Sequence, residues 1–115
     1  MRIAITGSQK LSEYNLEKYI SDEITEIIST GNNGFDKCVK EFALKNNIKY
    51  NEIIPQYNRY SDKALLIRNY LIAEYVDFAI VFWDGEDIET KLFINVFKER
   101  HKTIYIIRRK NRDSN

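Results

Sequence analysis

The sequence has few of the residues on which cysteine and histidine chemistry depends. Cys38 is the only cysteine, so the chain cannot form an internal disulfide framework or a cysteine-based zinc site. His101 is the only histidine, which excludes the usual histidine metal clusters and any serine–histidine–aspartate triad that does not use His101. We therefore expect neither a metal ion nor a cofactor, and the sequence identifies no catalytic residue.

Long apolar runs and a strong net charge are also missing. No segment approaches the roughly 18–20 apolar residues of a transmembrane helix, and residues 1–6 are too short an apolar run for a signal peptide. We therefore expect a cytoplasmic protein without a membrane partner. The formal net charge is +1, so no overall field attracts nucleic acid. The basic run over 108–112 is interpreted as belonging to a solvated tail, residues 109–115, that follows one domain over residues 1–108.

What the chain does have is a regular alternation of strand-like and helix-like segments. Its 115 residues are 43% hydrophobic and 30% charged, which is the composition of one globular domain. Two apolar runs, 79–82 and 104–107, are continuous, which is typical of strands buried on both faces of a parallel sheet. Strands are predicted at residues 2–6, 50–54, 77–83 and 103–107, with a weaker candidate at 27–30.

Between these strands, apolar residues recur at helical spacing. The spacing predicts four helices, over residues 14–24, 35–46, 62–75 and 90–100, with Ser12 as the N-cap of the first. The resulting order, β-α-β-α-β-α-β-α-β, is typical of a parallel sheet with right-handed crossovers. The predicted fold class is therefore α/β: a single Rossmann-like three-layer domain, with a mostly parallel sheet of about five strands and helices on both faces.

Every glycine of the chain follows a predicted strand. In an open α/β sheet, ligands bind outside the carboxyl ends of the strands. A glycine at a strand end either forms an ordinary turn or lets the backbone approach a ligand closely. Because glycines follow three strands at the same edge of the sheet, a binding site is favoured. The glycines are Gly7, Gly31, Gly34 and Gly85.

The loop before the second predicted helix is the best anion candidate. Residues 31–34 combine two glycines with Asn32 and Asn33, so backbone N–H groups can turn toward a phosphate at the positive end of a helix dipole. Gly7 and Ser8 add a further amide and a hydroxyl.

Other side chains near these strand ends each have two interpretations. Arg68 either pairs with a carboxylate or acts as a bidentate phosphate clamp. Trp83 either stacks on a base or belongs to the core. Asp36 either caps the second predicted helix or holds a ribose hydroxyl. The pair Asp84 and Asp87 is either a Mg²⁺ site or an acidic surface loop.

In their order along the chain, these segments resemble those of the SLOG superfamily and, within it, of the small stand-alone Rossmann-like proteins. The resemblance rests on Gly7-Ser8, on residues 31–36, on a segment over 60–69 that ends in Arg-Asn, and on Phe-Trp-Asp-Gly at 82–85. It implies nucleotide or nucleotide-derived ligands, because some relatives are phosphoribohydrolases that release the base of a nucleoside monophosphate and others sense signals such as cyclic ADP-ribose isomers. Together, the resemblance and the strand ends predict a ligand shell of Gly7, Ser8, Gln9, Gly31, Asn32, Asn33, Gly34, Asp36, Arg68, Asn69, Trp83, Asp84, Gly85 and Thr90.

Several positions depart from the family pattern. Gln9 stands where the family has arginine, and Leu65 stands where it has the glycine of an Ala-Gly pair. A serine and then a Gly-Thr pair are expected after Trp-Asp-Gly, but the chain has Asp87 and then Glu89. Phe93 occupies the neighbourhood of the hydrolases' catalytic glutamate. Glu89 puts bulk and negative charge where a phosphate would lie, so we expect fewer phosphates, and binding rather than catalysis.

The predicted function is the binding of a nucleotide or of a nucleotide-derived, ADP-ribose-like small molecule, as a sensor, carrier or sponge. The alternative is a nucleoside-5′-monophosphate phosphoribohydrolase with Asp36, Asp84 or Glu89 as its carboxylate. A third interpretation is a structural subunit with a vestigial cleft. The resemblance also implies a homo-oligomer, and the heavy use of isoleucine, asparagine and lysine is typical of an AT-rich genome, such as that of a low-GC bacterium or its phage.

Overall fold

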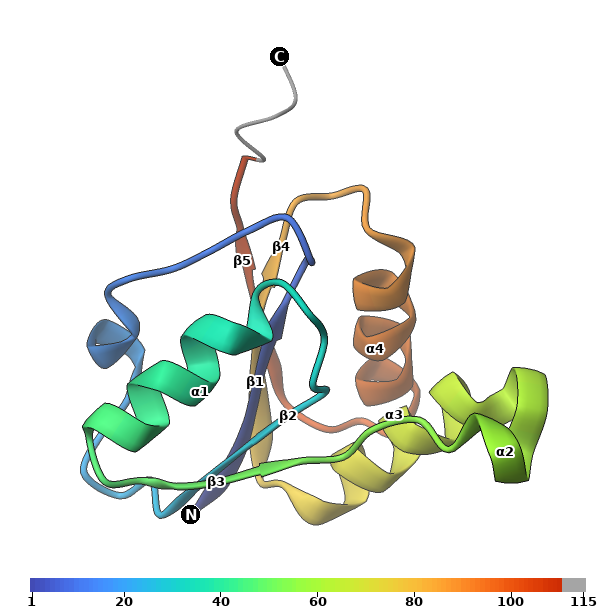
Figure 1. Ribbon diagram of the computed structural model, residues 1–115, viewed down its shortest axis with the longest axis horizontal. Helices are drawn as coiled ribbons and strands as arrows, with labels where there is room; N and C mark the ends of the chain where they lie inside the picture. Colours follow the sequence, from blue (N-terminus) through green and yellow to red (C-terminus); the bar gives the residue numbers. More distant parts are fainter. Residues whose placement is uncertain (111–115) are drawn as a thin grey trace.

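Five parallel strands form one sheet in the order β3-β2-β1-β4-β5 (Figure 1). The computed structural model describes residues 1–110. The chain builds one half of the sheet outward from β1 to β3 and then returns beside β1 to build the other half, which is a Rossmann-like topology. The predicted α/β fold is confirmed. The strands are β1 (Arg2–Gly7), β2 (Glu26–Ser29), β3 (Lys49–Glu52), β4 (Phe78–Trp83) and β5 (Ile104–Arg108).

Strands β1 and β4 are buried on both faces, as predicted for the apolar run over 79–82. The run over 104–107 is not, because β5 lies at the edge of the sheet and exposes Tyr105. Side chains alternate across a strand, so in β1 Ile3 and Ile5 join one core cluster while Ala4 joins the cluster on the opposite face. In β4, Phe82 belongs to the first cluster and Val81 to the second.

Helices cover both faces of the sheet (Figure 1). On one face lies α1 (Asp36–Lys45), whose Val39 and Ala43 pack into the first cluster. On the other face, α3 (Ala64–Tyr75) and α4 (Ile88–Glu99) pack into the second cluster. Within residues 1–110, no helix is both long and apolar enough to cross a bilayer.

The predicted helix over residues 14–24 is wrong. Only a short 3-10 turn, η1 (Leu16–Tyr19), forms there, and its N-cap is Asn15 rather than Ser12. The helix cannot continue because Ser21 makes a turn of its own: its hydroxyl oxygen accepts from the Glu23 amide and its carbonyl oxygen accepts from the Ile24 amide. Serine competes with helical hydrogen bonds in this way. The weaker candidate at 27–30 is a strand, β2.

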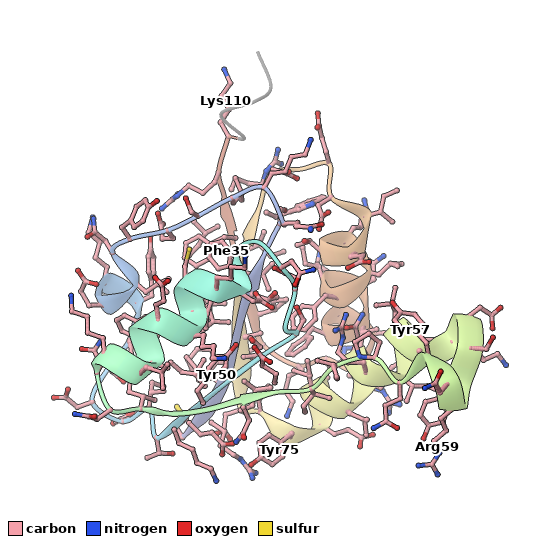
Figure 2. The ribbon with its side chains drawn as sticks, viewed as in Figure 1. Phe35, Tyr50, Tyr57, Arg59, Tyr75 and Lys110 are labelled. Carbon is pink, nitrogen blue, oxygen red and sulfur yellow. The ribbon has the colours of Figure 1, made fainter. Side chains whose placement is uncertain are left out.

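A short projection connects β3 to α3. It consists of α2 (Tyr57–Tyr60) and the 3-10 turn η2 (Ser61–Lys63), and none of its residues is buried. In Figure 1 α2 stands apart from the body of the domain, and Figure 2 shows Tyr57 and Arg59 on it. The predicted helix over 62–75 starts at residue 64, because residues 61–63 form a 3-10 turn that follows the break at Ser61, where φ is +54°.

Candidate functional site

A small hollow, here called the edge hollow, lies at the carboxyl ends of β1 and β2, next to the start of α4. The chain direction across the sheet switches between β1 and β4, which is where open α/β sheets hold ligands. The volume of the hollow that the centre of a water molecule can occupy is about 20 Å³. This is room for about one ordered water. It brings together five of the predicted site residues: Gly7, Gln9, Asn32, Arg68 and Thr90.

Arg68 is the positive charge of the edge hollow. It lies on α3 and is only 5% exposed, with Nε donating to Asn69 Oδ1 at 2.8 Å and Nη1 donating to the Thr30 carbonyl oxygen at 3.2 Å. Among the described residues, no carboxylate lies within 4.0 Å of the guanidinium. Nη2 donates a hydrogen bond to none of the described residues. Of the two interpretations of Arg68, the ion pair with a carboxylate is therefore not found.

The electrostatics of Arg68 follow from this burial. Burial lowers the pKa of the guanidinium, while the nearby charges of Glu89, Asp36 and Tyr57 act in the opposite direction. Arginine stays protonated in proteins, so the side chain carries a buried charge that has carboxylates nearby but, within residues 1–110, none at ion-pair distance. Binding an anionic ligand would stabilise this charge, because leaving a buried charge uncompensated costs free energy.

Asp36 ties the ends of β1 and β2 together. Its Oδ1 accepts from the Thr6 hydroxyl at 2.8 Å, and its Oδ2 accepts from the Thr30 hydroxyl at 2.5 Å, the Thr30 amide at 2.9 Å and the Asn32 amide at 3.3 Å. Burial raises the pKa of Asp36, and these hydrogen bonds oppose the rise. Its acceptor atoms are therefore used within the chain, and its side chain does not cap α1.

The glycine–asparagine loop is closed by its own side chain. Asn32 Oδ1 accepts from the amides of Gly34 at 3.0 Å and Asp36 at 3.2 Å, and Asn32 Nδ2 donates to the Gly7 carbonyl oxygen at 3.2 Å. Two amides in the region predicted to cradle a phosphate thus already have a partner. Asn33, in contrast, is exposed and does not line the hollow.

Two of the strand-end glycines allow neighbouring segments to approach closely. A Cβ atom on Gly34 would lie 1.7 Å from the carbonyl oxygen of Gln9, and one on Gly7 would lie 2.6 Å from the Phe35 ring. Phe35, at the start of α1, is labelled in Figure 2. These glycines bring the loops after β1 and β2 into contact, and Gly7, Gln9 and Asn32 of these loops line the edge hollow.

The loop after β4 is tied to the loop after β1. Ser8 Oγ accepts from the Asp84 amide at 3.0 Å, and Asp84 Oδ1 accepts from the amides of Glu86 at 2.8 Å and Asp87 at 2.9 Å. Partial burial alone would raise the pKa of Asp84, but these amide hydrogen bonds outweigh it and hold the pKa below its usual value. Ser8 and Asp84 position the loops and do not line the hollow.

Trp83 already has neighbours on its ring. The Arg108 guanidinium carbon lies 5.2 Å and Lys91 Nζ lies 5.6 Å from the ring centroids, both within cation–π range. The indole Nε1 donates to the Asp87 carbonyl oxygen at 3.3 Å, and the ring packs against the second core cluster. Arg108 also contacts Gly85, where a Cβ atom would lie 2.3 Å from Nη2.

The start of the basic run lies against the domain. Arg109 Nη2 pairs with Glu13 Oε2 at 3.0 Å and donates to the Tyr19 hydroxyl at 2.9 Å. Lys110 follows beyond the end of β5 (Figure 2). The remainder of the predicted tail, residues 111–115, lies outside the described residues.

Two carboxylates lie at the start of α4, and only one of them has side-chain partners in the part of the chain that the structure describes. Asp87 is the N-cap, and its Oδ2 accepts from the Thr90 amide at 3.1 Å and from the Thr90 hydroxyl. Glu89, in the first turn of the helix, is exposed and lines the hollow. Within residues 1–110, no group of three or more metal-ligating side chains is assembled.

Two hydroxyls and one aromatic ring of the hollow were not among the predicted site residues. Thr6 and Thr30 come at the ends of β1 and β2, and Phe93 forms its apolar wall from α4. A polar residue at the last position of an otherwise apolar strand is a signal that could have identified both threonines. Comparisons of the chain with models of protein families, with curated proteins and with solved structures found no match.

Proposed function

We propose that this chain binds a nucleotide-type small molecule whose anionic group pairs with Arg68 in the edge hollow. The observation that carries the proposal is the buried guanidinium of Arg68, which has two internal hydrogen bonds and no ion pair among the described residues. A guanidinium is suited to bidentate recognition of phosphate or carboxylate. The resemblance to the SLOG superfamily, and the position at a topological switch point, support a nucleotide or ADP-ribose-like ligand over other anions.

The size of the hollow supports a ligand that inserts one small group. A volume of about 20 Å³ is far below the roughly 300–1,000 Å³ of pockets that enclose a whole drug-sized ligand. In this proposal the anionic group reaches toward Arg68, and the rest of the ligand lies along the exposed strand ends beside Gln9. Such a ligand would be held at the surface, which suits a sensor, carrier or sponge.

Binding is better supported than hydrolysis. A phosphoribohydrolase needs a carboxylate that can exchange a proton at the bound ligand. Burial raises the pKa of Asp36, but both of its carboxylate oxygens accept hydrogen bonds, from Thr6, Thr30 and Asn32. Asp36 also does not line the hollow. Asp84 is engaged in its turn. Glu89 does line the hollow but is exposed, so a hydrolase would have to work with this single solvated carboxylate.

Calorimetry with AMP and ADP-ribose tests the proposal. The parent protein is expected to bind at least one of them, and Arg68→Ala is expected to abolish the signal. Arg100→Ala is the matched control, because Arg100 is exposed and lies over the Tyr70 ring, outside the hollow. Circular dichroism of each variant establishes that it is folded, and Arg68→Lys provides a variant that keeps the charge.

Two outcomes would overturn this function. One is the absence of binding by the parent protein; the other is binding by folded Arg68→Ala at the parent's affinity. Chromatography of the same mixtures for free adenine separates binding from hydrolysis, and release of base by the parent protein would favour the hydrolase.

A further inference from the structure

Glu89 is a carboxylate of the edge hollow without a partner. Its side chain is exposed and lines the same hollow as Arg68. Among the described residues it makes no side-chain hydrogen bond and no ion pair within 4.0 Å. Asp87 is different, because its carboxylate accepts hydrogen bonds from the amide and the hydroxyl of Thr90. Glu89 is therefore the carboxylate whose charge is left to act on whatever enters.

The charges that line the hollow set a limit on the ligand. One guanidinium, that of Arg68, stands against the two carboxylates of Asp87 and Glu89. A ligand with one anionic group can take the unpaired guanidinium. Each further phosphate would lie within the field of two carboxylates, since like charges at short range repel and solvent screening at a partly buried mouth is incomplete.

Resting on the proposed function, we infer that Glu89 is the specificity-determining residue of this site, which limits the ligand to a nucleotide-type molecule with a single phosphate and selects against the two phosphates of ADP-ribose. Di- and triphosphates are disfavoured by repulsion from Glu89 rather than by lack of space, because the strand ends outside the hollow are open to solvent. Glu89 is a selectivity residue in this account and has no part in holding the preferred ligand.

Calorimetry with AMP, ADP and ATP tests the inference. The titrations use buffer with a chelator and no divalent cation, at one low ionic strength, so that each phosphate keeps its charge. The parent protein is expected to bind AMP most tightly and ATP least. Glu89→Gln is expected to strengthen ATP binding by about two- to five-fold, the range of a partly exposed charge pair, and to change AMP binding less. Raising the salt concentration should lower the ratio of AMP affinity to ATP affinity in the parent, and lower it less in Glu89→Gln, in which only Asp87 still repels.

Glu86→Gln is the matched control. Glu86 is an exposed glutamate of the neighbouring loop and does not line the hollow, so this variant should keep the parent's ranking. The inference would be overturned if the parent bound the three nucleotides with equal affinity, or if both variants gained the same affinity for ATP. In either case AMP binding would still support the proposed function. Tighter binding of ADP-ribose than of AMP would also overturn the inference alone, whereas failure of the parent to bind any of the three nucleotides or ADP-ribose would overturn both.

Discussion

The guanidinium of Arg68 donates to the main-chain carbonyl oxygen of Thr30 at 3.2 Å, across a sequence separation of 38 residues. This bond joins α3 to the end of β2. A second bond from Nε to Asn69 fixes the plane of the guanidinium. Two of the three guanidinium nitrogens are thus held by the chain before any ligand arrives. Such preorganisation lowers the entropic cost of binding an anion.

Arg68→Lys is expected to destabilise the fold as well as weaken binding. A lysine ammonium cannot reproduce the planar fork, so either Thr30 or Asn69 loses its donor. An unsatisfied buried acceptor costs about 1–3 kcal/mol, which urea denaturation would measure as a lower free energy of unfolding. Arg100→Lys, at an exposed position, is expected to change it by less than about 0.5 kcal/mol. Equal losses in the two variants would contradict this role.

Gly34→Ala tests the contact between the loops after β1 and β2. The added Cβ atom would lie 1.7 Å from the Gln9 carbonyl oxygen, so the loops must separate. We expect a loss of about 1–3 kcal/mol, as for other forced overpacking, and weaker ligand binding because the wall of the hollow moves. Asn33→Ala alters the exposed neighbour and should leave the melting temperature nearly unchanged. A Gly34→Ala melting temperature equal to the parent's would argue against the contact.

Most of the fold could be predicted from the sequence because its elements follow apolar periodicity. The runs that became β1, β4 and β5 are apolar and bounded by polar residues, and α1, α3 and α4 each carry a stripe that faces the sheet. The segment 14–24 has the same periodicity but contains the turn at Ser21, which depends on local hydrogen bonds that spacing does not reveal.

The site could be predicted only in part. Arg68, Asn32 and Thr90 do lie at the edge hollow, because strand ends and helix starts converge at one edge of the sheet. The sequence cannot show that amides of the glycine–asparagine loop are already used by Asn32, or that Arg108 lies over Trp83. These partners come from side chains whose direction depends on tertiary packing.

Trp83 is the only tryptophan, so its fluorescence reports on Arg108. Arg108→Ala uncovers the ring, and we expect stronger quenching by acrylamide with a stability change below about 1 kcal/mol. Arg109→Ala is the control, because Arg109 pairs with Glu13 and does not lie over Trp83. Quenching that is the same in the parent and in both variants would contradict the position of Arg108.

Asp36 is expected to give the free energy of unfolding a pH dependence of known sign. Its pKa in the folded state is raised from the ordinary value of 3.8, so the folded protein holds its proton more tightly than the unfolded chain. The stability that this group contributes is fully present when the pH is below the ordinary pKa of an aspartate, and it is lost as the pH rises through the pKa of the folded state.

Urea denaturation at a series of pH values measures this dependence. Asp36→Asn lacks it, so the stability of the parent relative to this variant should fall as the pH rises above 3.8. Asp62→Asn, at an exposed position, should follow the parent. A parent advantage that grows with pH would show that the hydrogen bonds from Thr6 and Thr30 outweigh burial.

The most direct test of the account is where a ligand binds. Titration of ¹⁵N-labelled protein with AMP should shift the amide resonances at the carboxyl edge of the sheet, at Gly7, Asn32, Glu89 and Thr90, together with the Arg68 side chain. Shifts confined to the separate groove between residues 13–17 and α1, which Glu13, Cys38 and Lys45 line, or no shifts at all, would contradict it.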